Sequence, residues 1–366
     1  MSEVKKSIFD AYPEEIIELL ESLGEKKFRA KQVLSWIFEH KVYDPDLMTN
    51  LPKSTREKLK ELFEVKLPET VSSLTAEDGA TKLLLKTAKG QNVEAVILRY
   101  KNRVSLCVSS QVGCKLACSF CQTGKLGFFR NLDAAEIMSQ FALANTIVKE
   151  EGKKISHIVF MGMGEPLDNY DNVIRTVNLM MHEQAYSLNP KNVTVSTSGI
   201  VPKIIDMATS TPAALAVSLH AAKDELRTEL MPINRKYNLE KLKDALLHWQ
   251  KTTGKKLTIE YILIKDKNCG KTQAKALVKF LHGLRAKINL IPFNSHPGME
   301  YDRPSDEDIR EFQKYLSDRS FPAPVRYSKG LEVSGACGQL AAKNKENLNN
   351  QPYRKAVIGV TTDATQ

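Results

Sequence analysis

Four of the six cysteines in this chain lie within fifteen residues, at positions 107, 114, 118 and 121. Three of them form the pattern Cys114-x3-Cys118-x2-Cys121, close enough along one loop for their thiolates to bind a single inorganic group. Three thiolates can hold three irons of a cubane iron–sulfur cluster and leave the fourth iron without a protein ligand. An open metal position separates a catalytic metal site from a closed structural one. The pattern therefore predicts a catalytic iron–sulfur site.

The alternative for this loop is a structural zinc site, with Cys107 or a histidine as the fourth ligand. The spacing differs from the paired C-x2-C motifs of zinc ribbons, and an aromatic residue, Phe120, directly precedes the last cysteine. A cytosolic chain of this size needs no disulfide framework, so the cluster of cysteines indicates metal or redox chemistry. We favour the iron–sulfur interpretation and keep zinc as its alternative.

Small and polar residues follow four of the five later strand candidates, at the point where each strand ends. They are Met161-Gly-Met-Gly-Glu-Pro166, Ser196-Thr-Ser-Gly199, Ser218-Leu-His220 and Phe293-Asn294. Glycines at such turns allow a close approach of the backbone, and Glu165 can accept a hydrogen bond from an ammonium group. Strand alternation turns Ser218 and His220 toward the same face. Each turn alone is ordinary, but their repetition predicts a binding site.

These residues need a scaffold that brings the ends of several strands together. The strand candidates are Arg103–Val108, Ile155–Phe160, Asn192–Ser196, Ala213–Leu219, Leu257–Leu263 and Lys287–Pro292. Helical stretches near 133–150, 170–183, 201–208, 238–252 and 271–284 alternate with them, and Asp133 and Glu136 form a capping box at the first. This alternation predicts an α/β fold with a parallel sheet, here a partial (β/α)6 barrel whose site lies at the carboxyl ends of the strands.

The part of the chain before the barrel has a different pattern. Apolar stripes at helical spacing, punctuated by prolines, predict about three helices over residues 12–64. Alternating runs with turn signals follow, and they predict a short antiparallel sheet. The expected organisation is a helical accessory domain (1–66), a short antiparallel linking sheet (67–102), the barrel with an active-site loop (103–341) and a polar, loose tail (342–366).

The chain has 366 residues and a formal net charge of +10, with 42% hydrophobic and 26% charged residues. This composition excludes a collagenous, coiled-coil or wholly disordered protein. No run approaches the roughly 18 apolar residues of a membrane span, and the N-terminus has no signal-peptide core, so we expect a cytoplasmic protein. Residues 1–65 carry a net charge of −2 and the remainder +12. The basic excess suggests a nucleic-acid partner, although a basic balance without a specific partner explains it equally well.

The cysteine pattern, with an aromatic residue before its last cysteine and a strand before its first, resembles the radical S-adenosylmethionine (SAM) superfamily. A longer set of motifs, from about residue 25 to residue 341, resembles the RlmN/Cfr family of radical SAM RNA methyltransferases. These motifs are Phe28-Arg-Ala-Lys-Gln, Cys107-Val-Ser-Ser-Gln-Val-Gly-Cys114, Arg130-Asn-Leu132, Gly162-Met-Gly-Glu-Pro-Leu167, Ser196-Thr-Ser-Gly199, Ser218-Leu-His220, Met231-Pro-Ile-Asn234 and Cys337-Gly-Gln-Leu340.

Within this family, Val112, Pro166 and Ser198 look like the RlmN branch, which methylates adenosine C2, rather than the Cfr branch, which methylates C8. One segment departs from the usual pattern. RlmN proteins usually have an acidic residue and two alanines before the second active cysteine, whereas this chain has Ser334-Gly-Ala336.

The resemblance implies a radical SAM barrel that uses a [4Fe–4S] cluster and two SAM molecules per turnover. Cys114, Cys118 and Cys121 would bind the cluster. Cys337 would take a methyl group from one SAM, and a 5′-deoxyadenosyl radical from a second SAM would activate that methyl carbon to bond with adenosine C2. Cys107 would then release the RNA by forming a disulfide with Cys337.

Further roles are implied position by position. Glu94 aligns with the proposed proton acceptor of the family, and a strand carboxylate that faces water is its equally weighted alternative. Cys269 matches no motif and has no expected role. The positions implied to bind SAM are Gly164, Glu165, Ser196, Ser218, Leu219, His220 and Asn294.

The implied partners are 23S rRNA at the peptidyl-transferase centre, a tRNA beside its anticodon and an electron donor of the flavodoxin or ferredoxin type. A monomer with no membrane association is expected. Lys26, Lys27, Arg29 and Lys31 form a basic patch that either meets phosphates or is an ordinary solvated helix face. Two alternative functions stay open: methylation of adenosine C8 in 23S rRNA, as by Cfr, and a non-catalytic RNA-binding protein with a structural metal site.

Overall fold

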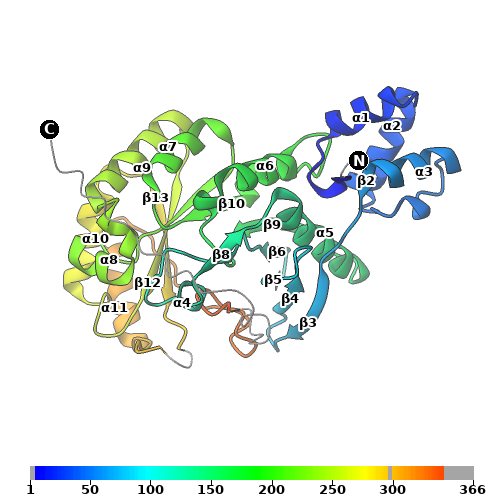
Figure 1. The fold of residues 1–366 in the computed structure, drawn as a ribbon. Helices are drawn as coiled ribbons and strands as arrows, with labels where there is room; N and C mark the ends of the chain where they lie inside the picture. The colour runs from blue at the N-terminus through cyan, green and yellow to red at the C-terminus, as the bar shows by residue number, and fades with distance from the viewer. Residues whose placement is uncertain (1–4, 296–298, 342–366) are drawn as a thin grey trace.

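The computed structural model describes residues 5–295 and 299–341, and a nine-stranded sheet runs through the centre of this part (Figure 1). Its strand order is β13-β12-β11-β10-β9-β6-β5-β4-β3. The parallel strands are β6 (Arg103–Cys107), β9 (Ile155–Phe160), β10 (Val193–Thr197), β11 (Ala214–Ser218), β12 (Leu257–Leu263) and β13 (Ala286–Pro292). Each pairs with the next along the chain, which is barrel order rather than the reversed order of doubly wound sheets. The predicted partial barrel is confirmed.

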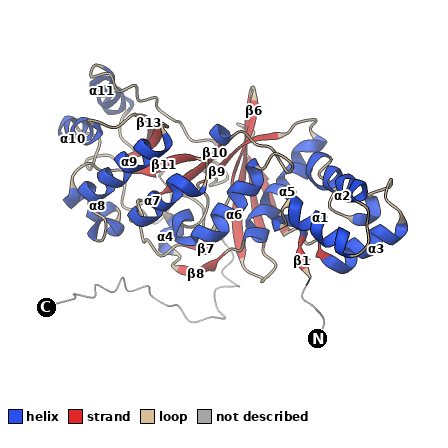
Figure 2. Ribbon diagram, turned by 90° about the horizontal axis from the view of Figure 1, so that it is seen from above, coloured by secondary structure: helices blue, strands red, loops and turns tan. Residues whose placement is uncertain are grey.

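Helices between the barrel strands cover one side of the sheet (Figure 2). They are α5 (Ala134–Glu150), α6 (Tyr170–Met181), α7 (Val201–Ser210), α8 (Asp224–Leu230), α9 (Leu239–Thr253) and α10 (Lys271–Leu281). The capping box predicted at the start of α5 is confirmed, because the Glu136 N–H donates to Asp133 Oδ1 (2.9 Å) and the Asp133 N–H donates to Glu136 Oε2 (3.2 Å). The cap fixes where the first crossover helix begins.

The linking strands extend the barrel sheet rather than forming a separate one. They are β3 (Glu69–Thr75), β4 (Thr81–Lys86) and β5 (Asn92–Tyr100), and they pair in antiparallel fashion. The last of them, β5, also pairs with β6, and Val96 lies opposite Cys107. Side chains of β5 therefore reach the same face of the sheet as the end of the first barrel strand.

The N-terminal helices gather at one end of the molecule (Figure 1). They are α1 (Pro13–Ser22), α2 (Lys27–Leu34) with a π-helical turn at Ser35–Glu39, and α3 (Lys53–Leu62); the short strands β1 (Lys6–Ser7) and β2 (Phe63–Glu64) pair beside them. Three aromatic rings join this part to α5: Tyr186 packs edge-on against Phe38 (5.1 Å) and against Phe141 (5.0 Å). One hydrophobic core therefore continues from the accessory helices into the barrel.

The structure contains three features that the sequence analysis did not predict. A hairpin of β7 (Gln111–Gly113) and β8 (Phe128–Asn131) encloses the short helix α4 (Gln122–Lys125), and α8 and α11 (Asp306–Ser317) are additional helices. The expected polar tail, 342–366, lies outside the described residues. Within residues 5–295 and 299–341, no helix combines the length and the apolar character that a bilayer crossing needs.

Candidate active site

The three clustered cysteines lie in the loop that the β7–β8 hairpin closes. The Cys114 N–H donates to the carbonyl of Gly127 (2.9 Å), and the Cys121 N–H donates to that of Cys118 (3.1 Å). Gly113, at the mouth of the loop, has φ +75°, and a Cβ there would lie 1.9 Å from the Gly127 oxygen. Only glycine fits this close approach of the two strands, so the hairpin fixes both ends of the cysteine loop.

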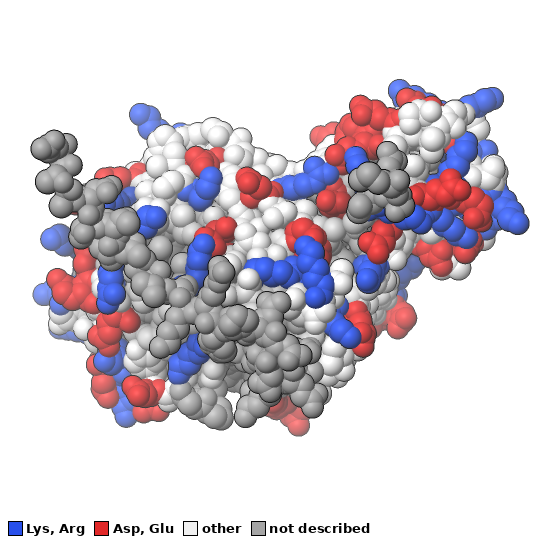
Figure 3. Space-filling view, in the orientation of Figure 1, with Lys and Arg blue, Asp and Glu red and all other residues white. Residues whose placement is uncertain are grey.

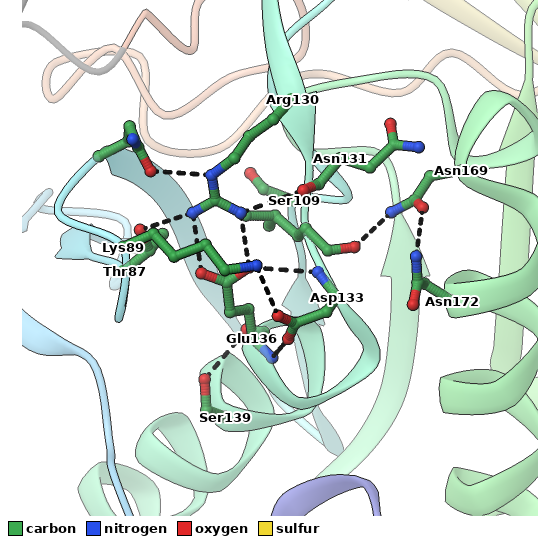
Figure 4. Close-up of polar contacts among 12 residues, drawn as sticks. Thr87, Lys89, Ser109, Arg130, Asn131, Asp133, Glu136, Ser139, Asn169 and Asn172 are labelled. Atoms are coloured by element: carbon green, nitrogen blue, oxygen red, sulfur yellow. Dashed lines mark hydrogen bonds and ion pairs between the residues drawn. The ribbon is translucent and has the colours of Figure 1, made fainter. Parts of the chain in front are cut away.

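A buried ion pair anchors the hairpin to the barrel (Figure 4). Arg130 on β8 donates from Nη1 and Nη2 to the two carboxylate oxygens of Glu136 on α5 (2.6 and 2.8 Å). The same guanidinium donates to Gln91 Oε1 (2.8 Å) and Thr87 Oγ1 (2.9 Å) in the β4–β5 turn. Bidentate arginine–carboxylate geometry is both strong and directional, so the hairpin holds one orientation on the sheet.

The thiols of the loop share one electrostatic environment. Burial raises the pKa of Cys114 to about 12, and it raises the pKa of Cys118 well above its ordinary range, with further increases from Cys121 and Cys114. Burial also raises the pKa of Cys121, while N–H groups of Gly124 and Thr123 that point at its sulfur lower it. Metal binding requires thiolates, and N–H groups directed at sulfur stabilise them.

These residues fit the cofactor that the motif predicts. Each thiolate of a cubane site binds a different iron, so the three sulfurs surround the cluster rather than a single ion. Within the described segments, no three histidine, cysteine or acidic side chains gather closely enough to hold one metal ion. The hydrophobic side chains packed against the cysteines, among them Leu116, Phe120 and Met231, restrict solvent access to the loop.

The loop after β9 carries the Gly164–Glu165 pair. Gly164 has φ +102°, and a Cβ there would lie 2.6 Å from the Cβ of Gln111, so this position also requires glycine. The Glu165 carboxylate is buried and accepts hydrogen bonds from the Ser198 N–H (2.8 Å) and the Leu167 N–H (3.1 Å). Burial raises its pKa, and the hydrogen bonds from Ser198, Thr197 and Leu167 oppose that rise. Glu165 thus ties the end of β9 to the end of β10.

The next two strand ends place the remaining predicted residues nearby. Ser196 is buried on β10, and Ser218 is the last residue of β11. The side chain of Leu219 is buried in the core, so only its backbone is available to a ligand. The predicted shared face of Ser218 and His220 is wrong, because His220 has φ +57° and lies beyond the strand. Strand alternation ends where the backbone leaves the extended conformation.

His220 is buried and neutral. Burial, and to a smaller extent the nearby charge of Arg227, lowers its pKa to about 3. Its Nδ1 accepts a hydrogen bond from the Ile262 N–H (3.1 Å), so a neutral ring carries its proton on Nε2 as a donor. The ring packs edge-on against Phe120 of the cysteine loop, with centroids 4.8 Å apart. His220 therefore joins β11 and β12 to the predicted cluster loop.

Two of the three cysteines outside the motif, Cys107 and Cys337, lie close enough for the charge of one to affect the other. Cys107 is buried at the end of β6, and Cys337 lies on an exposed loop; all six cysteines are free thiols. Burial raises the pKa of Cys107, and the charge of Cys337 raises it further. Burial likewise raises the pKa of Cys337 to about 11, with added contributions from Glu260 and Cys121. Although the Cys337 residue is exposed, the surrounding protein atoms desolvate its sulfur, so the thiol is protonated near neutral pH.

Hydrogen bonds hold the Cys337 loop directly on the cysteine loop. The Gln122 N–H donates to the carbonyl of Gly338 (2.8 Å), and Thr123 Oγ1 donates to that of Leu340 (2.7 Å). Asn294, predicted to bind SAM, donates from Nδ2 to Ser328 Oγ (2.9 Å) and lies 3.5 Å from the Cys337 carbonyl. The second active cysteine of the prediction therefore sits beside the predicted cluster.

Glu94 on β5 points into the same region. It is 3% exposed, so the alternative of a carboxylate that faces water is wrong. Its Oε1 pairs with Lys82 Nζ (3.2 Å), and its Oε2 accepts a hydrogen bond from the Ala341 N–H (2.7 Å). Because Val96 lies opposite Cys107 and Glu94 is two residues before Val96, the Glu94 and Cys107 side chains share one face of the sheet.

The sequence-based prediction missed two buried charged residues of this site. Glu260 lies on β12, directly between Ser218 on β11 and Asn289 on β13, and accepts a hydrogen bond from Asn289 Nδ2 (2.9 Å). Burial raises its pKa to about 7. Arg227 on α8 is fully buried beneath the strand ends. The sequence signal that could have identified Glu260 is a single acidic residue within an otherwise apolar strand. The signal for Arg227 is the Met231–Asn234 motif, because Arg227 donates to Asn234 Oδ1 (2.8 Å).

Comparisons with known proteins agree with this geometry. Residues 7–65 match the ribosomal RNA large subunit methyltransferase N-terminal domain, and residues 108–269 match the radical SAM superfamily. A dual-specificity RNA methyltransferase RlmN from Francisella tularensis subsp. tularensis (strain FSC 198) is 44% identical over 368 residues, which is 99% of each chain. The chain belongs to the RlmN family. An RlmN from Pseudomonas putida (strain W619) is 43% identical and aligns over 96% of this chain and 93% of its own length.

A solved structure of a radical SAM methyltransferase has the same fold as this chain. The crystal structure of a radical SAM methyltransferase from Sphaerobacter thermophilus matches it with a TM-score of 0.88 at 40% identity, over 92% of this chain and 100% of that one. The protein is therefore a radical SAM RNA methyltransferase, and the cofactors of its superfamily are a [4Fe–4S] cluster and SAM. The non-catalytic and zinc alternatives are accordingly dropped.

Proposed function

We propose that this enzyme methylates C2 of an adenosine in the peptidyl-transferase centre of 23S rRNA and C2 of a tRNA adenosine beside the anticodon. The observation that carries the proposal is the approach of two cysteines, Cys107 and Cys337, that are not part of the cluster motif. A methyltransferase that only moved the methyl group of SAM to a nucleophile would not need this pair. A reaction that passes through a covalent RNA–cysteine bond needs one thiol to bind the carbon and another to release it.

The choice of carbon explains the need for radical chemistry. Adenine C2 lies between two ring nitrogens and is too poor in electrons to attack the methyl group of SAM. When bound, the cluster and SAM supply a one-electron cleavage that removes a hydrogen atom from a methyl group. We assign the cluster to Cys114, Cys118 and Cys121. We assign SAM to Gly164, Glu165, Ser196, Ser218, Leu219, His220 and Asn294.

The first task of the chain is to carry the methyl group. Cys337 gives its proton to solvent and attacks the methyl carbon of a first SAM, so that it becomes S-methylcysteine and S-adenosylhomocysteine leaves. Its thiol has a pKa raised to about 11, and Glu260 and Cys121 contribute to that rise. A cationic sulfonium beside the sulfur opposes these anionic neighbours, so methyl-donor binding and thiol deprotonation favour each other. The carbon thus activated by a second SAM joins adenine C2, which makes two SAM molecules per turnover.

The second task is to release the product. Glu94 takes the proton from C2, and the adduct radical loses one electron, which a cluster held by Cys114, Cys118 and Cys121 would accept. The Cys107 thiolate then attacks the sulfur of Cys337, so that an S–S bond forms as the S–C bond breaks. The electron pair of the broken bond stays on the carbon, which takes up the proton that Cys107 lost and becomes the methyl group. Burial and a shared sheet face support these roles, because Glu94 and Cys107 lie beside each other and away from bulk water. A thiol kept protonated by burial until it is needed also avoids premature oxidation.

RNA must deliver an unstacked base to this buried site, so we propose that the target adenosine is unpaired or flipped out. Lys26, Lys27 and Lys31 are exposed on and beside α2, and Arg29 lies over the exposed ring of Phe28 (4.9 Å), an arrangement that suits phosphate contact and base stacking. On the face in Figure 3, cationic and anionic side chains alternate over the N-terminal helices. Local contacts rather than one broad basic field would therefore orient the RNA.

The remaining parts of the proposal concern the cellular setting. A low-potential donor of the flavodoxin or ferredoxin type reduces the cluster, because iron–sulfur potentials can lie far below those of soluble thiols. The enzyme acts as a monomer in the cytoplasm, where its rRNA and tRNA substrates are made.

The decisive experiment is the Cys107→Ala variant, prepared without oxygen and with its cluster loaded. We expect it to accumulate a covalent RNA–protein adduct, seen as a band that carries both protein and labelled RNA, because the S–C bond can no longer be resolved. Cys269→Ala is the matched control, since Cys269 is equally buried but lies apart from the site, and it should turn over without an adduct. Cys107→Ala protein that binds cluster and SAM, retains Cys337 and yields no adduct would contradict the assignment.

The modified nucleoside separates the C2 and C8 products. Digested 23S rRNA and tRNA from the reaction should contain 2-methyladenosine by mass spectrometry against authentic standards. A product that matches 8-methyladenosine would place the enzyme in the Cfr type of activity instead.

A further inference from the structure

Arg227 carries a buried positive charge that makes no direct ion pair with an acidic side chain of the described residues. The residue is fully buried on α8 (Asp224–Leu230). None of the ion pairs within residues 5–295 and 299–341 includes it. Burial of an unpaired charge is costly, so such residues persist where something else compensates them or where function needs them.

The guanidinium of Arg227 donates its hydrogen bonds to neutral oxygens of the site. Nη2 donates to the carbonyl of Ser198 (2.7 Å), Nε to that of Leu219 (3.3 Å) and Nη1 to Oδ1 of Asn234 (2.8 Å). Nη2 also lies 3.5 Å from the carbonyl of Ser218. Arg227 therefore ties together the ends of β10 and β11, the two strand ends at which four of the proposed SAM-binding residues lie.

The carboxylate of Asp224 is linked to the guanidinium only through the side chain of Asn234. Asp224 Oδ1 accepts hydrogen bonds from Asn234 Nδ2 (2.8 Å) and from the Leu239 N–H (2.9 Å). Burial lowers the pKa of Arg227 to about 10; a Cys118 thiolate opposes that change most, and Asp224 opposes it less. Cys118, one of the three proposed cluster ligands, therefore lies close enough for its charge to act on this guanidinium.

The helix of Arg227 also contacts the cysteine loop directly. The Ser119 N–H donates to the carbonyl of Leu230, the last residue of α8 (3.0 Å), and Ser119 directly follows Cys118. Leu230 and Met231 share a buried cluster with Phe120, against which the three cysteines of the motif pack. The charge and the loop are therefore held in a fixed relation by the backbone.

We propose that Arg227 is the buried counter-charge of the cluster, fixed so that it favours the reduced, more anionic state. The inference rests on the proposed cluster ligands, Cys114, Cys118 and Cys121. Reduction adds one electron beside a guanidinium that is shielded from solvent, and net charge around a cluster helps to set its potential. The buried cation also stabilises the thiolate of Cys118 before reduction. Arg227 is a positioning residue, since it touches neither the cluster irons nor the substrate.

The test compares the midpoint potential of the cluster in four proteins: wild type, Arg227→Gln, Arg227→Lys and Arg235→Gln. Arg235 is exposed near the end of the same segment and serves as the matched control. Each protein is reconstituted without oxygen, its iron is counted, and its potential is read by redox titration with electron paramagnetic resonance. We expect Arg227→Gln to shift the potential to more negative values, Arg227→Lys to stay closer to wild type, and Arg235→Gln to leave it unchanged.

An unchanged potential in fully loaded Arg227→Gln would overturn the proposal, and so would an equal downward shift in Arg227→Lys, since that would identify hydrogen bonding as the cause. If Arg227→Gln assembles no cluster, the lysine variant decides. If Arg227→Lys binds its full complement of iron and has a midpoint potential near that of wild type, the counter-charge role is supported. If Arg227→Lys loses as much iron as Arg227→Gln, that role is refuted. A wild-type protein without a cluster would instead refute the proposed function itself, so the two failures are distinguishable.

Discussion

Replacement of Glu94 by glutamine tests the buried polar junction beneath the Cys337 loop. Its carboxylate is 3.2 Å from Lys82 Nζ, and the two side chains are only 4% and 14% exposed. At an effective dielectric constant of about 20, two charges at this distance attract each other by about 5 kcal/mol. Removal of one partner from a buried pair costs about 3–5 kcal/mol, because the other charge is left uncompensated.

The expected loss for Glu94→Gln lies at the lower end of that range. Glutamine retains an oxygen that can accept the hydrogen bond from the Ala341 N–H, and Lys82 can regain some water at its partly exposed end. We therefore expect a loss of about 3 kcal/mol, which lowers the unfolding midpoint by roughly 5 °C in a chain of this length. The assay is thermal unfolding of anaerobically prepared protein, followed by circular dichroism at one scan rate.

Two further variants give this prediction its controls. Glu69→Gln removes a similar pair, with Lys86 at 3.3 Å on the same sheet, but those side chains are 67% and 46% exposed and should contribute little. The double variant Lys82→Met with Glu94→Gln removes both buried charges and should recover most of the lost stability. Strict additivity of the Glu94 and Lys82 effects, or a Glu94→Gln midpoint within about 1 °C of wild type, would refute the reasoning.

The same variant separates structural support from proton transfer. If Glu94 accepts the C2 proton, Glu94→Gln should still form S-methylcysteine at Cys337 but should not release methylated RNA. Mass spectrometry of the Cys337 peptide and of the RNA reads the two steps independently. Lys82→Met, which disturbs the pair but leaves the carboxylate, should retain measurable product formation.

Further outcomes concern pH dependence and glycine positions. The pKa of His220 is lowered to about 3, so between about pH 6.5 and 3 the unfolded chain binds a proton that the folded chain does not. The free energy of unfolding therefore falls as the pH falls through this range. We expect His220→Asn to reduce that slope by up to about 1.4 kcal/mol per pH unit, measured by urea unfolding. Glu260 changes the stability in the opposite direction. Its pKa is raised to about 7, so the folded chain keeps a proton that the unfolded chain loses above about pH 4.5, and its contribution to stability is lost as the pH rises toward 7. We expect Glu260→Gln to gain stability relative to wild type across this pH range. Parallel pH profiles of variant and wild type would contradict either assignment. Gly164→Ala should cost more than about 1 kcal/mol and weaken SAM binding in calorimetry, since its Cβ would lie 2.6 Å from that of Gln111 at φ +102°. Gly335→Ala is its control, because a Cβ there meets nothing closer than 3.4 Å, and it should be neutral or stabilising by up to about 1 kcal/mol.

The barrel strands could be predicted from the sequence because their signals are local. The predicted strand Ile155–Phe160 coincides with β9, since an apolar run ends there at a glycine-containing turn. The orientation of His220 could not be predicted in the same way. A single residue at φ +57° ends the alternation of β11, and nothing in the residues Ser218-Leu-His220 marks that change.

The contacts that assemble the site are beyond local patterns altogether. Thr123 and Leu340, which join the two cysteine loops, are 217 residues apart, and Glu94 and Ala341 are 247 apart. Composition and periodicity give no information on such pairs. The family resemblance pointed to Cys107, Cys337 and Glu94 without any geometry, and these contacts bring the three residues into one region of the structure.

Residue types with unusual chemistry can be recognised in a sequence, whereas the buried charges that the fold places around them cannot. Three cysteines at close spacing stand out, but Arg227 is one charged residue of the short helix Asp224–Leu230 and differs in no local way from its exposed neighbours. What distinguishes it is that the carbonyls of Ser198 and Leu219 and the amide of Asn234 converge on it from three separate segments. Members of one family that share every cysteine can therefore still differ in how readily the cluster accepts an electron, because that property depends on which charges the fold buries beside it.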